Sequence, residues 1–151
     1  MSLAFAEARI ALEEDETPVG AVVVKNGELL GRGRNQTKKL RDPTAHAEMI
    51  AITAACQKLD GDHLDGCDVF TTLEPCPMCG TALVLSRAAR IFYAAEDPRM
   101  GGCGSLIDIV RDPRMPHRLE VYRAGSETES KRLLSEFFAR RRTERRNLTN
   151  E

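Results

Sequence analysis

The middle of the chain alternates between strand and helix, and this alternation constrains the fold more than any other feature. The segments CDVFTTL (67–73) and RIFYAA (90–95) have the apolar and β-branched residues of buried strands. Between them, CPMCGTALVLSRA (76–88) is typical of a helix, with Pro77 in the first turn, where proline is best tolerated. Strands that alternate with helices indicate a sheet with parallel pairs and helices packed on its faces.

The N-terminal half predicts two helices and a hairpin. The expected elements are a helix at 3–14, strands near 19–24 and 28–34, and a helix that begins near Thr44 and runs to about Lys58. The two strands flank KNG, and Asn-Gly between aliphatic runs is a strong hairpin signal. We expect Asp42 or Thr44 to cap the second helix, because both are good N-cap residues.

The C-terminal half begins with a glycine-rich loop. We then expect a short helix within SLIDIVRD (105–112), a strand within RLEVYRA (118–124) and a last helix at about 127–146. In that last helix Leu133, Leu134, Phe137 and Phe138 follow helical spacing. We therefore expect at least one phenylalanine in the core.

Length and composition are those of one globular domain covering residues 1–151. The chain has 42% hydrophobic residues, and Glu7 and Arg9 interrupt its apolar N-terminus, so no run approaches the roughly 18 residues of a membrane span. Five cysteines, an odd number without a secretory signal, argue against a disulfide framework. The sequence therefore predicts a soluble, cytoplasmic protein without a membrane partner, whose thiols are free or bind metal.

Cys76 and Cys79 form a C-x-x-C motif at the predicted start of a helix. This spacing lets two thiolates close on one metal ion, and the helix N-terminus favours their negative charge. A thioredoxin-like redox pair is the alternative interpretation. His46, beside a carboxylate at the start of the preceding helix, favours metal, because a zinc site needs such a ligand and a redox site does not.

The predicted set of His46, Cys76 and Cys79 leaves the fourth tetrahedral position for water, as in catalytic zinc sites. A structural site would need a fourth protein ligand. The candidates for that ligand are His63, Cys56, Cys67 and Cys103. None of them lies at a ligand-like spacing from the others, so we expect an open, catalytic site.

Glu48 is the candidate proton carrier. Zinc lowers the pKa of a bound water to about 7, but attack on an amidine carbon also requires proton transfer. Positions i and i+2 of a helix point about 200° apart, so His46 and Glu48 converge only on a metal that lies off the helix end. The alternative is a solvated glutamate that stabilises the helix dipole.

The motifs HAE (46–48) and PCPMC (75–79) resemble the signature of the zinc-dependent cytidine/deoxycytidylate deaminase superfamily. The similarity extends to six segments that span nearly the whole chain. They are PVGAVVV (18–24), GRGRNQTKKLRDPTAHAEMIAI (31–52), TTLEPCPMC (71–79), LSRAARIFYAAEDPRMGGCGSLIDI (85–109), HRLEV (117–121) and LLSEFFARRR (133–142). Together they resemble the family of bacterial tRNA adenosine deaminases.

This resemblance implies a three-layer α/β/α fold with a mixed five-stranded sheet, like that of cytidine deaminases, and one Zn²⁺ per subunit of a homodimer. It implies hydrolytic deamination of adenosine to inosine at the wobble position of a tRNA anticodon stem-loop. Glu48 would move a proton to the adenine ring and then to the departing ammonia. Asn35, Ala47 and Asp97 would bind substrate, although an asparagine after a strand and an Asp-Pro pair are also common turn formers.

Two basic groups can serve RNA binding in a chain whose net charge is only −1. The segment 32–41 has five basic residues and no acid, and 131–146 has seven basic against two acidic residues, 7 − 2 = +5. Local positive potential of this size suffices to bind phosphates, although a charge run is often only a solvated helix face. The expected RNA contacts are Arg34, Lys38, Lys39, Arg41, Arg99, Phe138, Arg141 and Arg142.

Two positions depart from the family pattern. Pro116 stands where a small polar residue is frequent, and Cys103 stands at a position that is more usually alanine-like. Both lie away from the zinc signature, so they concern RNA-facing details more than chemistry.

The main alternative function is a small-molecule deaminase for guanine, cytosine or dCMP with the same zinc chemistry. The segment GSLIDI (104–109) and the basic tail favour RNA, because a free-base enzyme has no use for two basic patches. A non-catalytic, zinc-stabilised RNA-binding module would instead need a closed metal shell.

Overall fold

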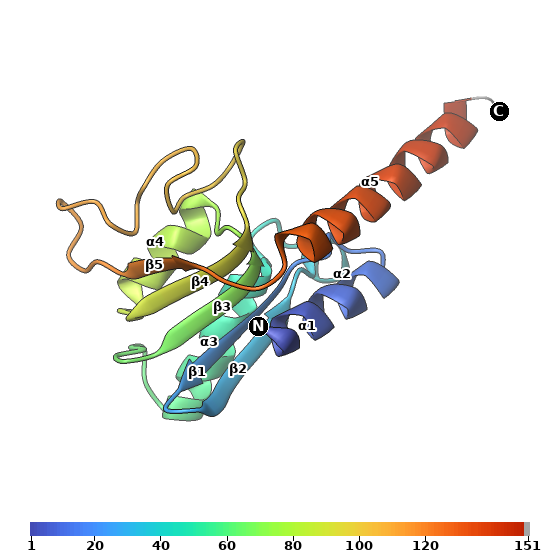
Figure 1. Ribbon diagram of the computed structural model, residues 1–151. Helices are drawn as coiled ribbons and strands as arrows, with labels where there is room; N and C mark the ends of the chain where they lie inside the picture. The colour runs from blue at the N-terminus through green and yellow to red at the C-terminus, as the bar shows by residue number, and fades with distance from the viewer. Residues whose placement is uncertain (150–151) are drawn as a thin grey trace.

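A computed structural model describes residues 1–149, and its five strands form one sheet in the order β2-β1-β3-β4-β5 (Figure 1). The strands are β1 (Gly20–Lys25), β2 (Glu28–Arg34), β3 (Asp68–Leu73), β4 (Arg90–Ala95) and β5 (Glu120–Arg123). β1 runs antiparallel to both β2 and β3, whereas β3, β4 and β5 are mutually parallel. The predicted mixed five-stranded sheet is therefore confirmed.

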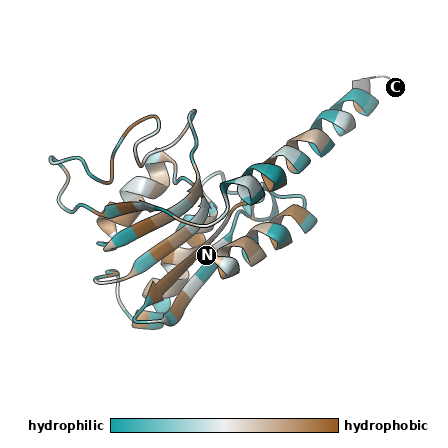
Figure 2. Cartoon of the chain, viewed as in Figure 1, coloured by the Kyte–Doolittle hydropathy of each residue, from teal (hydrophilic) through white to brown (hydrophobic). Residues whose placement is uncertain are grey.

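Helices cover both faces of this sheet and make three layers (Figure 1). The helices are α1 (Ser2–Glu13), α2 (Thr37–Leu40), α3 (Ala47–Leu59), α4 (Pro77–Leu85) and α5 (Glu127–Thr149). α1 and α5 pack together on one face, and α3 and α4 pack on the other. Hydrophobic residues are concentrated in the strands between them (Figure 2).

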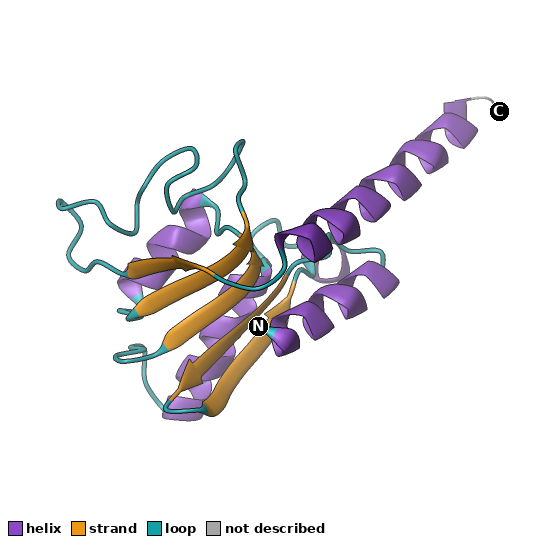
Figure 3. Cartoon of the chain, in the orientation of Figure 1, coloured by secondary structure: helices purple, strands orange, loops and turns teal. Residues whose placement is uncertain are grey.

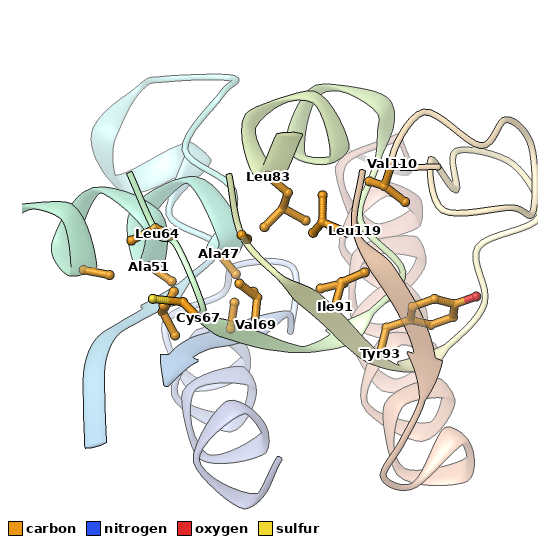
Figure 4. Close-up of a cluster of buried hydrophobic side chains, with 14 of the residues drawn as sticks. Ala47, Ala51, Leu64, Cys67, Val69, Leu83, Ile91, Tyr93, Val110 and Leu119 are labelled. Carbon is orange, nitrogen blue, oxygen red and sulfur yellow. The ribbon is translucent and has the colours of Figure 1, made fainter. Parts of the chain in front are cut away.

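Each face of the sheet has its own hydrophobic core. On the α3–α4 face, alanines of α3 and Leu83 of α4 pack against Val69 and Ile91 (Figure 4). On the other face, Phe5 of α1 and Phe137 of α5 belong to a smaller cluster. Phe137 is 5% exposed and Phe138 is 42% exposed, so one phenylalanine is in the core and its neighbour faces solvent, as predicted.

The close packing of α3 on β2 places the start of α3 at the end of the sheet where the candidate site lies. A Cβ on Gly31 or Gly33 would lie 2.4 Å from the carbonyl oxygen of Ala51 or Ala47, so only glycine permits this approach. Small residues on both sides bring the helix axis close to the strand. The start of α3 is thereby held beside Asn35, which directly follows β2.

The predicted start of α3 at Thr44 is wrong, and so is its capping by Asp42 or Thr44. The helix begins at Ala47, and His46 is the N-cap residue with extended backbone (φ −74°, ψ 156°) and no side-chain cap bond. Asp42 instead accepts hydrogen bonds from the amide and hydroxyl of Thr44 at 2.8 and 2.7 Å. This local turn competes with the helix and delays its start.

The connection between β4 and β5 also differs from expectation. The predicted helix at 105–112 is absent from the described chain, where this connection is a long loop (Figure 3). The amides of Leu106 and Ile107 both donate to Gly101 O at 3.1 Å, and Cys103 pairs with Asp108 in an isolated bridge. These bonds replace the helical i to i+4 pattern.

Two further differences concern helices. The short α2 was not predicted, and α5 begins at Glu127 as expected but continues to Thr149. Among residues 1–149 no helix combines the length and apolar character needed to cross a bilayer.

The glycine contact predicts a large effect of one methyl group. We expect Gly33→Ala to lower the free energy of unfolding by about 1–3 kcal/mol, because the new Cβ overlaps the α3 backbone. Gly61→Ala is the matched control, since its nearest neighbour would be 3.9 Å away. Urea unfolding of both variants measures the difference, and equal stabilities would contradict the packing argument.

Candidate active site

Three potential metal ligands meet where two helices begin. His46 immediately precedes α3, Cys76 is the N-cap of α4, and Cys79 lies in the first turn of α4. His46 Nδ1 lies 3.6 Å from Cys76 Sγ and 3.5 Å from Cys79 Sγ. Within the described residues these three form the only His/Cys/Asp/Glu group whose ligand atoms all lie within 4.8 Å of one another.

These distances fit a tetrahedral zinc ion. Zn–S and Zn–N bonds of about 2.3 and 2.1 Å at the tetrahedral angle place sulfur and nitrogen about 3.6 Å apart. His63, Cys56, Cys67 and Cys103 lie outside the group. The candidate zinc site among the described residues is therefore His46, Cys76 and Cys79, without a fourth His, Cys, Asp or Glu in the group.

The two sulfurs differ in their affinity for a proton. A hydrogen bond from Cys79 lowers the pKa of the Cys76 thiol to about 4, and His46 adds to this effect against the opposing effect of burial. The same hydrogen bond, together with burial, raises the pKa of Cys79.

Glu48 points toward the ligand group from the first turn of α3. Its side chain is 4% exposed, and Cys79 Sγ donates to Glu48 Oε2 at 3.6 Å. Burial is the main cause that raises the pKa of this carboxyl. His46 lies outside the helix and Glu48 inside it, so the two side chains converge off the helix end, as the i, i+2 spacing requires.

A cavity of about 290 Å³ opens beside these groups. It contains every residue that the sequence predicted to bind substrate, together with the predicted proton carrier and two ligands. Its lining comprises Thr17, Val19, Asn35, Thr37, His46, Ala47, Glu48, Leu73, Glu74, Cys76, Asp97 and Met100.

The amide of Asn35 is oriented by a buried carboxylate. Asn35 Nδ2 donates to Glu16 Oε2 at 3.1 Å and to Thr37 Oγ1 at 3.2 Å. Glu16 is 1% exposed and also accepts the amide of Lys39 at 2.8 Å. Because Nδ2 is engaged, the carbonyl Oδ1 of Asn35 is the group left to accept a hydrogen bond from a ligand.

Asp97 lines the cavity and also shapes its own loop. Its Oδ1 accepts the amides of Arg99 and Met100 at 3.1 and 3.3 Å, so the turn-forming role holds as well. Sequence reasoning missed two buried carboxylates: Glu74, which lines this cavity, and Glu16, which lies behind it as the partner of Asn35. Glu16 ends the acidic run EEDE, in which nothing separates a buried carboxylate from solvated ones.

The predicted RNA-binding residues divide into two groups. Lys38, Phe138, Arg141 and Arg142 gather around a second cavity of about 360 Å³, which shares Thr17 with the first. The other four, Arg34, Lys39, Arg41 and Arg99, line neither cavity.

Arg34 and Lys39 are engaged by acidic residues of the N-terminal segment. Arg34 donates two hydrogen bonds to Glu14 at 2.9 Å and one to Glu7 at 3.1 Å, and Lys39 pairs with Glu14 at 3.5 Å. The bonds from Arg34 lower the pKa of the Glu14 carboxyl. Arg34 thus connects β2 to α1.

The two departures from the family pattern lie in different surroundings. Cys103 is 1% exposed within the large core, whereas Pro116 lines a surface hollow with Arg87 and His117. Neither lines the cavity beside the ligands.

Comparisons with known proteins agree with this geometry. Residues 1–95 match the family described as the cytidine and deoxycytidylate deaminase zinc-binding region. The tRNA-specific adenosine deaminase of Aquifex aeolicus (strain VF5) is 44% identical over 142 residues, which cover 94% of this chain and 93% of that protein.

Solved structures show the same fold. A structure from a study of A-to-I editing by tRNA:A34 deaminases at the wobble position has a TM-score of 0.85 at 42% identity, covering 89% of this chain and 97% of that one. Guanine deaminase from Bacillus subtilis has a TM-score of 0.62 at 34% identity, covering 93% and 90%.

The fold and the His/Cys/Cys site define a zinc-dependent deaminase of the cytidine and deoxycytidylate deaminase class. Within this class the identity extends over nearly the full length of both chains. The protein belongs to the family of tRNA-specific adenosine deaminases.

Zinc removal should destabilise the protein. We expect one zinc per chain by elemental analysis, and at zinc concentrations 100-fold above Kd the metal contributes about 2.7 kcal/mol of stability. Cys79→Ala should bind less than one equivalent, because two ligands remain. Cys56→Ala is the control, since Cys56 lies outside the ligand group and should leave zinc content unchanged. Equal zinc content in the two variants would contradict this assignment.

Proposed function

We propose that this protein is a zinc-dependent hydrolase that converts adenosine to inosine at the wobble position of a tRNA anticodon, with Glu48 as its proton carrier. The observation that carries the proposal is a buried carboxylate beside an open His/Cys/Cys ligand set, at the wall of a cavity of about 290 Å³. Membership of the tRNA-specific adenosine deaminase family gives the substrate.

His46, Cys76 and Cys79 would hold zinc, which when bound would lower the pKa of a water for hydrolysis at C6 of adenine. Glu48 would accept one proton of the attacking water and give it to the adenine ring. It would then take the second proton of that water and give it to the amino group, which leaves as ammonia. Burial suits Glu48 to this work, because a raised pKa brings its protonated form closer to neutral pH.

The cavity holds a base that has left its stack. Enzymes that act on a base take it from a single strand or rotate it out of a duplex. Asn35 Oδ1 accepts a hydrogen bond from the nucleoside, and Ala47 and Asp97 contribute to the wall around it. An anticodon loop supplies such an unpaired adenosine.

Contacts with the rest of the RNA come from the basic groups. Lys38, Arg141 and Arg142 surround the second cavity with Phe138, which is exposed enough to stack on a base. Arg41 and Arg99 add positive charge on exposed loops. We place the enzyme in the cytoplasm, where reducing conditions keep its cysteines free for zinc.

Glu48→Gln tests the chemistry without removing volume. We expect zinc content to be unchanged and inosine formation in an anticodon stem-loop with a wobble adenosine to fall by about 10²- to 10⁴-fold, because an amide cannot carry the proton. The measurement is inosine and ammonia produced by wild type and variant, with Glu48→Ala as a second variant. Full activity in either variant would refute the role of Glu48.

A small-molecule deaminase is the second candidate, and the 34% identity to guanine deaminase is the observation that favours it. The same assay therefore includes guanine, cytosine, adenosine and dCMP. Inosine formed only in RNA supports the tRNA function. Turnover of a free base or nucleotide with the RNA untouched would replace it.

We further propose that the enzyme is a homodimer that pairs through the outer face of α3. A cavity of about 350 Å³ on this face is lined in part by Leu40, Ala45, Met49, Ile50 and Ala54. Leu40 is 55% exposed, and a row of apolar side chains across two helices is typical of a surface that binds another protein. This face lies next to the segment that carries His46, so pairing there would bring two active sites close together.

A charge on this face should prevent pairing. We expect wild type to have twice the chain mass of 16.7 kDa in sedimentation equilibrium, and Thr53→Arg to have the mass of one chain. Thr53 is exposed and lines the cavity. An arginine there would place a charge in the interface and destabilise the dimer, but it would not disturb the fold of the single chain. Thr128→Arg, at an exposed site on α5, is the matched control and should remain dimeric. A dimeric Thr53→Arg protein would place the interface elsewhere.

A further inference from the structure

Glu74 is a buried carboxylate at the junction of the sheet and the active site. It directly follows β3 and lies two residues before the ligand Cys76. Its side chain is 2% exposed and lines the substrate cavity. Its amide donates to Ala95 O at 2.8 Å, which fixes its backbone to the end of β4.

Among the described residues, the donors to this carboxylate all come from the loop that follows β4. Oε2 accepts the amide of Asp97 at 3.0 Å and the hydroxyl of Ser105. Oε1 accepts the amides of Cys103 and Ser105 at 3.1 and 3.0 Å. These bonds hold both ends of the segment 97–105, which has no helix or strand of its own.

Glycines bring the middle of the same loop into contact with this carboxylate and with the zinc-binding segment. A Cβ on Gly101 would lie 2.5 Å from the carboxylate atoms of Glu74, and a Cβ on Gly102 would lie 2.9 Å from the backbone of Cys76. The amide of Gly102 donates to Pro75 O at 2.7 Å. The loop therefore wraps the residues immediately before and at the metal ligand.

We propose that Glu74 is a positioning residue that holds loop 97–105, and with it the cavity wall formed by Asp97 and Met100, at a fixed place relative to Glu48 and the zinc ligands. The proposal rests on the proposed function for the substrate that this wall contacts. Four donors converge on two oxygens, which a carboxylate satisfies because it is an acceptor at both. A glutamine at this position would present an NH₂ group to at least one N–H donor.

Two variants test this position. We expect Glu74→Gln to retain one zinc and to lower kcat/KM for the anticodon stem-loop by about 10- to 100-fold, since a displacement near 1 Å can cost about 100-fold. Ser105→Ala removes one of the four donors and should also lower kcat/KM, by a smaller factor. It also keeps the proposal testable if Glu74→Gln does not fold.

A double-mutant cycle with Asp97→Ala separates positioning from general destabilisation. If Glu74 acts through Asp97, then Glu74→Gln or Ser105→Ala costs less in the Asp97→Ala background than in wild type. Ser130→Ala is the matched control, because it removes a buried hydrogen bond to Thr72 O on β3 without touching the loop. Its effect should be on unfolding and not on kcat/KM.

Amide hydrogen exchange gives a readout that does not depend on activity. In Glu74→Gln the amides of Asp97, Cys103 and Ser105 should exchange faster, while those of β3 and β4 keep their protection. Additive costs in the cycle, or unchanged exchange in loop 97–105, would overturn the proposal. A wild-type protein inactive on RNA would instead overturn the proposed function, and the exchange result would still decide the role of Glu74.

Discussion

The site depends on the N-termini of α3 and α4, which lie close enough together for their side chains to bind one metal ion. α4 reaches this point because it follows β3 directly, and parallel β3 and β4 force its path across the sheet. α3 reaches it through the glycine contacts that let its backbone approach β2. Sulfur and nitrogen atoms from the two helices then lie at the separation that tetrahedral zinc requires. A change in the packing of either helix would therefore alter the distances between the metal ligands.

Much of the architecture follows from sequence because local signals and tertiary packing agree. The alternating strands, the Asn-Gly hairpin and the proline at the start of α4 each specify one element, and C-x-x-C with a distant histidine specifies the donor set. The start of α3 was misplaced because Asp42 and Thr44 satisfy a turn as well as a cap. The helix expected at 105–112 fails because bonds to a glycine loop outweigh a weak helical pattern.

Buried carboxylates mark the limit of such prediction. Glu48 and Glu74 line one cavity from separate parts of the chain, and the buried Glu16 accepts a hydrogen bond from Asn35 in the wall of that cavity. Glu48 and Glu74 each lie two residues from a metal ligand in sequence, but the hydrogen-bond donors to Glu16 and Glu74 are 19 to 31 residues away. Which acids are buried is decided by that convergence. The partners of Arg34 are likewise distant in sequence, on the N-terminal segment, and no local sequence pattern predicts them.

The last helix, α5, extends well beyond the part of it that packs in the core. Phe137 is the last residue of α5 that belongs to a buried core cluster of the described chain, and the helix continues to Thr149, away from the body (Figure 1). At 1.5 Å per residue this continuation is about 18 Å long. Arg140 pairs with Glu136 of the same helix, and Arg141 pairs both with Glu144 of that helix and with Asp15 just after α1. Because this part is held by its own backbone and by surface ion pairs, its length and charge can change in evolution without any repacking of the core.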